Sequence, residues 1–271
     1  MLSAIYNQLQ GIIPPDIGST LPNLRTMPSD LGKRTGLQTI AVHQNRFGTL
    51  PDSVANLSTY LILINLELNQ IHGSIPSGIG NLLSLTVLSM AVNNLAGPIP
   101  SSIGRLQKLH ALYLDQNKFT ELPSSLGNLT SLITLNLGEN NIHGSIPLSL
   151  GNCHSLLELD LYKNNLNGSI PYEIMNLSSI SIFLLLYHNA LTGSLPLEVG
   201  SLKNLAVMDL SYNRLSGSIP NTLNSCLSLE WLLLEANSLE GEIPQSLSTL
   251  RGLRVLDLSH KFVGADPKLS R

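Results

Sequence analysis

The sequence is short of aromatic and charged residues, which make up 4% and 12% of its 271 positions, and it holds two cysteines. Hydrophobic residues make up 43%, so we expect a substantial core built mainly from aliphatic side chains. Proteins that bind DNA or RNA need a basic face, whereas this chain has a formal net charge of −3. The composition therefore argues against a nucleic-acid partner.

Long apolar runs and a secretory leader are also missing from the sequence. No run of about 18 apolar residues occurs, which predicts no membrane-spanning helix. The opening residues MLSAIYNQLQG lack the basic start, the apolar stretch and the cleavage site of a signal peptide. We therefore expect no membrane contact by this chain itself, and the sequence as written does not indicate its location.

What the sequence does contain is a repeated motif, LxLxxN, whose closing residue is called here the motif asparagine. From Asn45 onward it recurs at a nearly constant spacing within the longer frame LxxLxLxxNxLxGxIPxxLGNLxx. The motif asparagines of this series are Asn45, Asn69, Asn93, Asn117, Asn140, Asn164, Asn189, Asn213 and Asn237. A period of about 24 residues, kept over most of a chain, predicts a solenoid in which each repeat forms one coil.

Each fixed letter of the frame has a structural meaning. In LxL, inward leucines alternate with outward residues, which is typical of a short strand, and stacked coils place these strands in a parallel sheet. The motif asparagine follows at the turn, where a side-chain amide can pair with backbone groups that are otherwise buried and unsatisfied. In GxIP, the permissive glycine and the φ-restricted proline shape the return segment.

The repeats predict one solenoid domain over residues 1–261, made of about ten 24-residue coils, followed by an irregular tail at 262–271. The interval between Asn7 and Asn45 is longer than one coil and shorter than two, so we expect a truncated coil near 24–36. Lys261 stands where the next motif asparagine would fall.

The segments LDLYKNNLNGSIPYEI and MDLSYNRLSGSIPNTL, together with GPIP and GEIP, resemble plant-type leucine-rich repeats, and the resemblance covers roughly residues 1–261. They are similar to ectodomains of plant leucine-rich-repeat receptor-like kinases, in the group that includes the rice bacterial-blight-resistance receptor kinase and the flagellin sensor. The resemblance implies an α/β repeat solenoid. This is a right-handed superhelix with a parallel β-sheet on its concave face and short irregular or 3-10 segments on its convex face.

The resemblance also implies a function. Such an ectodomain is a non-catalytic recognition module that binds a peptide or protein ligand, or a co-receptor kinase ectodomain, in innate immunity or development. The parent protein is then expected at the extracellular face of the plasma membrane. The sequence lacks the cysteine-paired caps, the membrane helix and the kinase of such receptors, so we interpret it as a fragment or truncated gene product. A genuine short protein with degenerate ends is the alternative.

A second functional hypothesis is a free-standing soluble inhibitor or decoy that resembles the polygalacturonase-inhibiting proteins. A kinase domain encoded after Arg271 would favour the receptor. A natural stop there, with a leader upstream, would favour the soluble protein.

The outward positions of the strands are the candidate ligand-binding site, because solenoids bind partners on the concave face. Tyrosine and tryptophan are favoured interface anchors, and stacking at one strand spacing per coil predicts a continuous aromatic-polar patch roughly 15–20 Å long. The patch comprises Tyr162, Lys163, Tyr187, His188, Tyr212 and Trp231, with Tyr113, Glu139 and Glu158 extending it toward the N-terminus. The alternative is that these residues are ordinary family variants that merely tolerate solvent.

A second outward column contains Asp160 and Asp209, which are also candidate ligand-binding residues. As catalytic carboxylates they are poor candidates, because they are expected about 10 Å apart, with Leu185 between them, on an open face without a pocket. We expect solvated surface acids. The seven histidines lack Cys, His or Glu partners at metal-ligand spacing. The sequence therefore predicts no enzyme, no metal site and no cofactor.

The two cysteines occupy the same position in their repeats. Cys153 and Cys226 each precede a motif asparagine by eleven positions and lie three coils apart. At ~4.8 Å per coil they are ~14 Å apart, beyond the ~7 Å Cα limit for a disulfide, so we predict no disulfide.

Glycosylation sequons stand at Asn56, Asn128, Asn167 and Asn176. A chain this rich in Asn, Ser and Thr would carry about four by chance, so they are candidates only.

Overall fold

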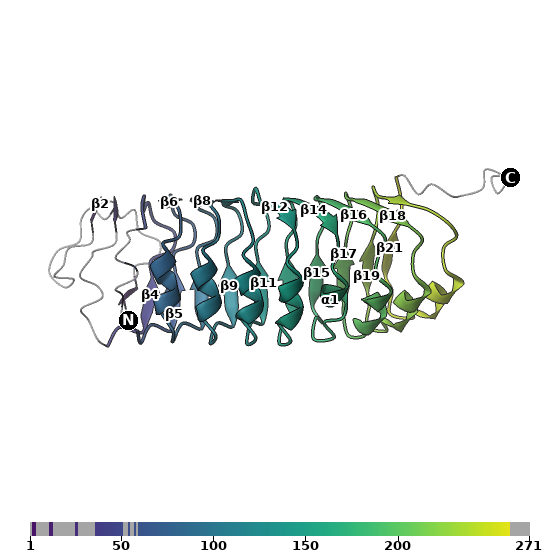
Figure 1. Ribbon diagram of the computed structural model, residues 1–271, viewed down its shortest axis with the longest axis horizontal. Helices are drawn as coiled ribbons and strands as arrows, with labels where there is room; N and C mark the ends of the chain where they lie inside the picture. The colour runs from purple at the N-terminus through teal and green to yellow at the C-terminus, as the bar shows by residue number, and fades with distance from the viewer. Residues whose placement is uncertain are drawn as a thin grey trace. The chain divides into compact units, whose positions relative to one another are not determined.

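The computed structural model describes residues 36–50, 54, 57 and 59–260, and the backbone of three two-residue strands before them. The chain divides into two compact units, Met1–Ile142 (unit 1) and His143–Arg271 (unit 2). Each unit is a stack of coils with its own strands and helical turns (Figure 1).

In unit 1, each coil contributes one short strand to a parallel main sheet. Its strands, in spatial order, are β1 (Leu2–Ser3), β4 (Thr39–Ala41), β5 (Leu63–Asn65), β7 (Val87–Ser89), β9 (Ala111–Tyr113) and β11 (Thr134–Asn136). A second set of strands follows the main-sheet strands along the chain: β6 (His72–Gly73), β8 (Asn94–Gly97) and β10 (Lys118–Phe119), with β2 (Gly11–Ile12) paired to β3 (Arg25–Thr26). The 3-10 turns are η3 (Ser77–Asn81), η4 (Ser101–Arg105) and η5 (Ser124–Asn128).

Unit 2 repeats this plan. Its main-sheet strands are β13 (Glu158–Asp160), β15 (Phe183–Leu185), β17 (Val207–Asp209), β19 (Trp231–Leu233) and β21 (Val255–Asp257). A second parallel sheet contains β12 (His143–Ser145), β14 (Asn165–Ser169), β16 (Ala190–Gly193), β18 (Arg214–Gly217) and β20 (Ser238–Leu239). The helical turns are η6 (Leu148–Asn152), α1 (Tyr172–Met175), η7 (Leu197–Ser201), η8 (Asn221–Ser225) and η9 (Gln245–Thr249).

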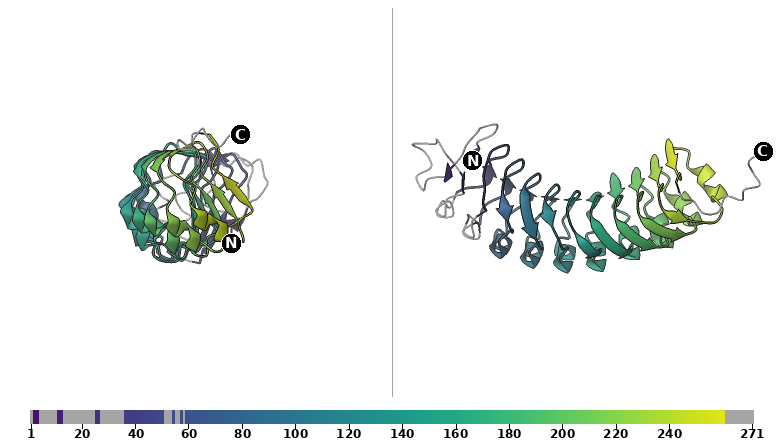
Figure 2. Two further views of the ribbon diagram at one scale, coloured as in Figure 1. Left: turned by 90° about the vertical axis from the view of Figure 1, so that its right-hand side faces the viewer. Right: turned by 90° about the horizontal axis from the view of Figure 1, so that it is seen from above.

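Within each coil, the main-sheet strand and the helical turn lie on opposite sides, as the view from above in Figure 2 shows. The core of the coils consists mainly of buried leucines. The middle residue of each main-sheet strand from β4 to β19 is fully buried, for example Leu159, Leu184, Met208 and Leu232, whereas Leu256 in β21 is exposed. The proline of GxIP directly precedes each helical turn, as Pro196 precedes η7 with φ −60°, because its fixed φ suits that position. Parallel strands that alternate with 3-10 turns confirm the predicted repeat solenoid.

The motif asparagines connect adjacent coils through their side chains. The Nδ2 amide of Asn213 donates to the carbonyls of Leu210 (3.1 Å) and Ser211 (3.1 Å) in its own coil and of Leu186 (3.0 Å) in the preceding one. Its Oδ1 accepts the Leu191 N–H at 3.0 Å. The same four contacts recur at Asn69, Asn93, Asn117, Asn140, Asn189 and Asn237.

The residue before each motif asparagine has a left-handed backbone. Its φ lies between 47° and 56° at all nine of these positions, none of them glycine, and His260, which precedes Lys261, has the same conformation with φ 54°. This conformation is unfavourable for ordinary residues. The amide of the adjacent motif asparagine donates to the carbonyls two and three residues before it, and these bonds stabilise the turn.

The predicted domain boundaries fall mainly on parts of the chain outside the described residues. Strand β1 pairs directly with β4, while most of the proposed truncated coil near 24–36, as well as Lys261 and the tail 262–271, lies outside them. The boundaries therefore stay predictions. Among the residues that the structure does describe, no helix has the length and apolar character needed to cross a bilayer.

Candidate functional site

The exposed side of the unit 2 main sheet, called here the strand face, brings together most of the predicted site residues. Four positions of each coil point to this face: the first and third residues of the strand and the two residues before the motif asparagine. In the last two positions lie Tyr162 and Lys163, Tyr187 and His188, and Ser211 and Tyr212, in three consecutive coils.

Five of these side chains form a continuous row, called here the aromatic row. The rings of Tyr162 and Tyr187 stack with centroids 4.8 Å apart and an interplanar angle of 18°. Tyr187 meets His188 edge-on at 5.7 Å, and His188 stacks on Tyr212 at 4.2 Å and 15°. Lys163 Nζ lies 5.6 Å from the centre of the Tyr162 ring, which is a cation–π distance.

The backbone explains why these rings meet. Lys163, His188 and Tyr212 all occupy the left-handed position, with φ of 47°, 52° and 51°. Because the motif asparagines fix this turn in register from coil to coil, side chains at the turn are one strand spacing apart, close enough to stack. Tyr212 ends the row with 47% of its surface exposed. The row is therefore a continuous set of ring contacts whose last member, Tyr212, remains exposed.

Trp231 lies on the strand face but in a different column. It is the first residue of β19 and pairs in register with Val207 and Val255. In its coil, the position held by Tyr162 and Tyr187 belongs to Glu235, four residues farther on, about 13 Å away along an extended chain. The predicted continuous patch that includes Trp231 is therefore corrected: the aromatic row ends at Tyr212, and Trp231 is a separate exposed ring.

Asp160 and Asp209 are buried, with 6% and 9% of their surface exposed, so the expectation of solvated surface acids was wrong. Each accepts a backbone N–H two residues on: Tyr162 N at 3.1 Å from Asp160 Oδ1, and Ser211 N at 3.0 Å from Asp209 Oδ1. The Ser211 hydroxyl also donates to Asp209 at 2.6 Å. Burial raises the pKa of Asp209, and the bonds from Ser211 oppose that shift. Both acids stabilise the turn that follows the strand.

The remaining predicted residues are more scattered. Glu158, half-buried, is the first residue of β13 and lies beside Phe183 at the same end of the strands as Trp231. Tyr113 and Glu139, also half-buried, belong to unit 1, where Tyr113 ends β9 and Glu139 takes the left-handed position.

The predicted site does not include Glu235, nor Asp257, although Asp257 stands in the same outward column as Asp160 and Asp209. Glu235 occupies the column of Tyr162 and Tyr187, and Asp257 ends β21. Burial raises the pKa of Glu235, a backbone hydrogen bond and one from the Ser211 side chain oppose that shift, and the charges of Asp257 and Asp209 add to it. Glu235 stands two residues before Asn237, as Tyr187 does before Asn189, so the count that places the tyrosines also places Glu235.

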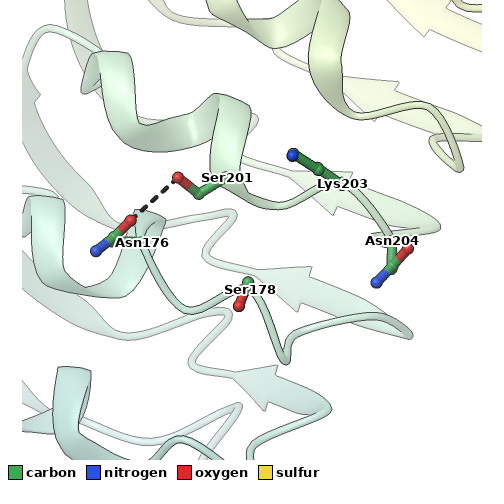
Figure 3. Close-up of a pocket in the computed structure, with 5 residues that line it drawn as sticks. All are labelled: Asn176, Ser178, Ser201, Lys203 and Asn204. Atoms are coloured by element: carbon green, nitrogen blue, oxygen red, sulfur yellow. Dashed lines mark hydrogen bonds between the residues drawn. The ribbon is translucent and has the colours of Figure 1, made fainter.

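The sequons that the structure describes lie away from the strand face. Asn128 ends η5, Asn167 lies in β14 of the second sheet, and Asn176 follows α1, while Asn56 lies outside the described residues. Asn176 and Ser178 help line a polar hollow on the helical side, completed by Ser201, Lys203 and Asn204 (Figure 3). There the Ser201 hydroxyl donates to Asn176 Oδ1 at 3.0 Å.

Both cysteines are buried, and neither is in a disulfide. Burial raises the pKa of Cys153 and of Cys226 to about 11, so both are protonated near neutral pH and serve as core residues. In the described part of the chain, no group of three His, Cys, Asp or Glu side chains is arranged to hold a metal ion.

A family model described as Leucine Rich Repeat matches six segments that together make up about half of the chain: residues 84–106, 108–129, 131–153, 155–177, 204–226 and 228–250. Among curated proteins, the receptor kinase-like protein Xa21 of Oryza sativa subsp. japonica is 50% identical over 58 residues, which are 21% of this chain and 6% of Xa21.

Two solved plant ectodomains show the same fold over most of the chain. The ectodomain of the membrane receptor kinase GASSHO1/SCHENGEN3 from Arabidopsis thaliana, in complex with CASPARIAN STRIP INTEGRITY FACTOR 2, is 34% identical with a TM-score of 0.74, over 89% of this chain and 32% of that one. The Arabidopsis receptor kinase HAESA, in complex with the peptide hormone IDA and the co-receptor SERK1, is 35% identical with a TM-score of 0.70, over 85% and 43%. The chain thus spans less than half of each of these relatives.

Proposed function

The chain belongs to the leucine-rich-repeat family, and we propose that it is the ligand-recognition part of a plant receptor-kinase ectodomain, with the strand face of unit 2 as its binding surface. Its ligand is a peptide or protein, a co-receptor ectodomain being one such protein, and the parent protein acts at the cell exterior in immunity or development. In this proposal the chain binds its ligand and catalyses no reaction.

The aromatic row is the observation that carries the proposal. Stacked tyrosine and histidine rings offer a large surface at little entropic cost, because packing between neighbouring coils has already restricted their rotamers. Each ring also has a polar tip that can hydrogen-bond to a peptide backbone. Tyr212 remains 47% exposed, so a ligand can still bury a large part of it.

Two further observations support the proposal, one on the choice of face and one on the class of ligand. The described sequons lie on the helical side or the second sheet, so a glycan at any of them leaves the strand face open. Two structural relatives, GASSHO1/SCHENGEN3 and HAESA, are described in complex with a protein factor and with a peptide hormone and co-receptor, respectively. We infer that this chain binds a ligand of a similar class.

A display library of random dodecapeptides, selected on the whole chain, tests the proposal. Peptides bound to the wild-type protein are expected to lose about tenfold or more in affinity for the Tyr187→Ala/Tyr212→Ala double variant, because interface tyrosines are typical energetic anchors. Far-UV circular dichroism should show an unchanged fold, since both side chains are at the surface.

The matched control is Tyr172→Ala, which removes a tyrosine that is 57% exposed on α1, on the helical side. It should leave affinity unaltered. Selected peptides that bind both tyrosine variants as tightly as the wild type would show that the row is not the binding surface.

A further inference from the structure

Asn128 and Asn176 begin equivalent sequons in differently built coils. Both stand at the position of the asparagine in LGN, both are exposed, and the sequons read NLT at Asn128 and NLS at Asn176. They differ in the segment that follows. Four residues, 130–133, lie between the next leucine and β11, whereas five, 178–182, lie between the next leucine and β15. The coil of Asn176 therefore has one extra residue between its helical turn and its strand.

The extra residue changes how this coil bonds to the next one. At a regular step, two successive N–H groups share one carbonyl. The first residue of β19 and the residue before it thus both donate to the Ala206 carbonyl, at 3.1 and 2.8 Å. One coil earlier, the Ala206 N–H donates to Ser181 at 3.0 Å and the Val207 N–H donates to Ile182 at 3.2 Å. The two coils are therefore joined by a distorted ladder, as at a β-bulge, just after the Asn176 sequon.

A hollow of about 490 Å³ lies between these same two coils (Figure 3). Its lining is polar throughout: Asn176 and Ser178 belong to the coil of α1, and Ser201, Lys203 and Asn204 to the coil of η7. Figure 3 shows one hydrogen bond within the lining, from Ser201 to Asn176, and none from the other three side chains. A hollow of this size that offers hydroxyl, amide and ammonium groups suits the hydroxyl groups of a sugar.

Asn176 is held in an orientation that a glycan can use. The Ser201 hydroxyl donates to its Oδ1 atom at 3.0 Å, so Nδ2, the atom that carries an N-linked sugar, is directed away from Ser201 (Figure 3). A sugar on Nδ2 leaves Oδ1 free to keep this bond. The backbone N–H of Asn176 donates to the Tyr172 carbonyl at 2.9 Å, which ties the residue to α1. A glycan here starts from an ordered residue in the lining of the hollow.

We propose that Asn176 carries an N-linked glycan whose first sugars lie over the polar hollow and connect the coil of α1 to the coil of η7. The oligosaccharide comes from a lipid diphosphate donor. The Nδ2 atom bonds to the anomeric carbon of the sugar, the bond from that carbon to the diphosphate breaks, one Nδ2 proton is released and the lipid diphosphate leaves. The glycan adds hydrogen bonds across a step where the backbone ladder is distorted. This inference rests on the proposed function only in that the chain enters the secretory pathway.

Secretion of residues 1–271 from plant cells, behind an added signal peptide, tests the occupancy of Asn176. Enzymatic deglycosylation converts each occupied asparagine into aspartate, which mass spectrometry locates in the sequence. We expect Asn176 to be occupied in most molecules. Protein retained in the cells is analysed in the same way, so a poorly secreted chain still gives the answer.

Hydrogen exchange tests where the glycan lies. Ser178→Ala removes the sequon and keeps Asn176. It should speed exchange at the Ala206 and Val207 N–H groups about tenfold, the effect of one or two lost hydrogen bonds. The matched control is Thr130→Ala, which removes the equivalent sequon from a coil without the extra residue and should leave exchange in that coil unchanged. Ser178→Ala in protein made without glycans in bacteria should also have no effect, which separates the loss of the glycan from the loss of the hydroxyl.

An unoccupied Asn176 would overturn the inference. So would a Ser178→Ala variant that changes exchange no more than Thr130→Ala does, or one that has the same effect in the bacterial protein. These outcomes leave the proposed function intact, because the dodecapeptide selection measures the strand face separately. Peptides that are indifferent to Tyr187 and Tyr212 would remove the proposed binding surface and leave the glycan result as it is.

Discussion

Units 1 and 2 are built from the same coil but present different side chains on their main sheets. The column that holds Tyr162, Tyr187, Ser211 and Glu235 in unit 2 holds Glu67, Ala91, Asp115 and Gly138 in unit 1. The buried leucines, the motif asparagines and the left-handed turns are the same in both. Scaffold and surface therefore vary independently, which allows one repeat frame to carry different recognition faces.

If the scaffolds are equivalent, the largest effect should come from a motif asparagine and should be the same in either unit. Asn93 and Asn213 each make four buried hydrogen bonds. Asn93→Ala and Asn213→Ala leave buried carbonyls and an N–H unsatisfied, at an expected cost of about 3 kcal/mol each. Denaturant unfolding measures the cost, and hydrogen exchange should locate the lost protection in the unit that carries the change. A cost of less than half as much in one unit would show that the scaffolds are not equivalent.

Glycines between neighbouring helical turns should give the next largest effect. A Cβ built on Gly104 of unit 1 would lie 2.4 Å from the Ser125 carbonyl oxygen, and one on Gly200 of unit 2 would lie 2.6 Å from that of Thr222. Both contacts are to backbone, so Gly104→Ala and Gly200→Ala should force adjacent coils apart and cost about 1–3 kcal/mol. At Gly252 the nearest atom is 3.6 Å away, so Gly252→Ala is the matched control and should be nearly neutral. A neutral Gly200→Ala would mean that coils in unit 2 can move apart freely.

The coil could be predicted from the sequence because its period, its inward leucines and its asparagine follow directly from strand and turn geometry. The aromatic row was found by the same count, since Tyr187 and Tyr212 stand two residues and one residue before their motif asparagines. Trp231 stands six residues before Asn237, and this different count separates it from the row. The error was to treat every outward residue as one surface.

Other features could not be predicted, because they depend on neighbouring coils. The burial of Asp160 and Asp209 follows from the backbone that turns back over each carboxylate, which the residue type alone does not reveal. Met175 stands at the glycine position of its coil, where Gly151 and Gly200 stand in the coils on either side. That coil forms α1 instead of a 3-10 turn, and the step from its motif asparagine to the next is one position longer than in the coils on either side.

The smallest expected effect concerns the acids of the two faces. Burial raises the pKa of Asp209 in unit 2 and of Asp115 in unit 1, where the charges of Glu67 and Glu139 raise it further. A raised pKa in the folded state means that folding favours the protonated acid. Each acid therefore adds stability below its ordinary pKa of 3.8 and loses that contribution as the pH rises through the folded-state value.

Asp257 should behave in the opposite way. Hydrogen bonds from Ser259 lower its pKa, so it adds stability above its ordinary pKa and loses it as the pH falls through the lowered value. Urea midpoints between about pH 3 and pH 6 test this. Relative to the wild type, Asp209→Asn and Asp115→Asn should each lack the stability that the replaced carboxyl group adds as the pH falls. Asp257→Asn should lack the loss of stability that protonation of Asp257 causes as the pH falls. Opposite slopes for Asp209→Asn and Asp115→Asn would show that the units differ in how they bury charge, and that surface and scaffold are coupled after all.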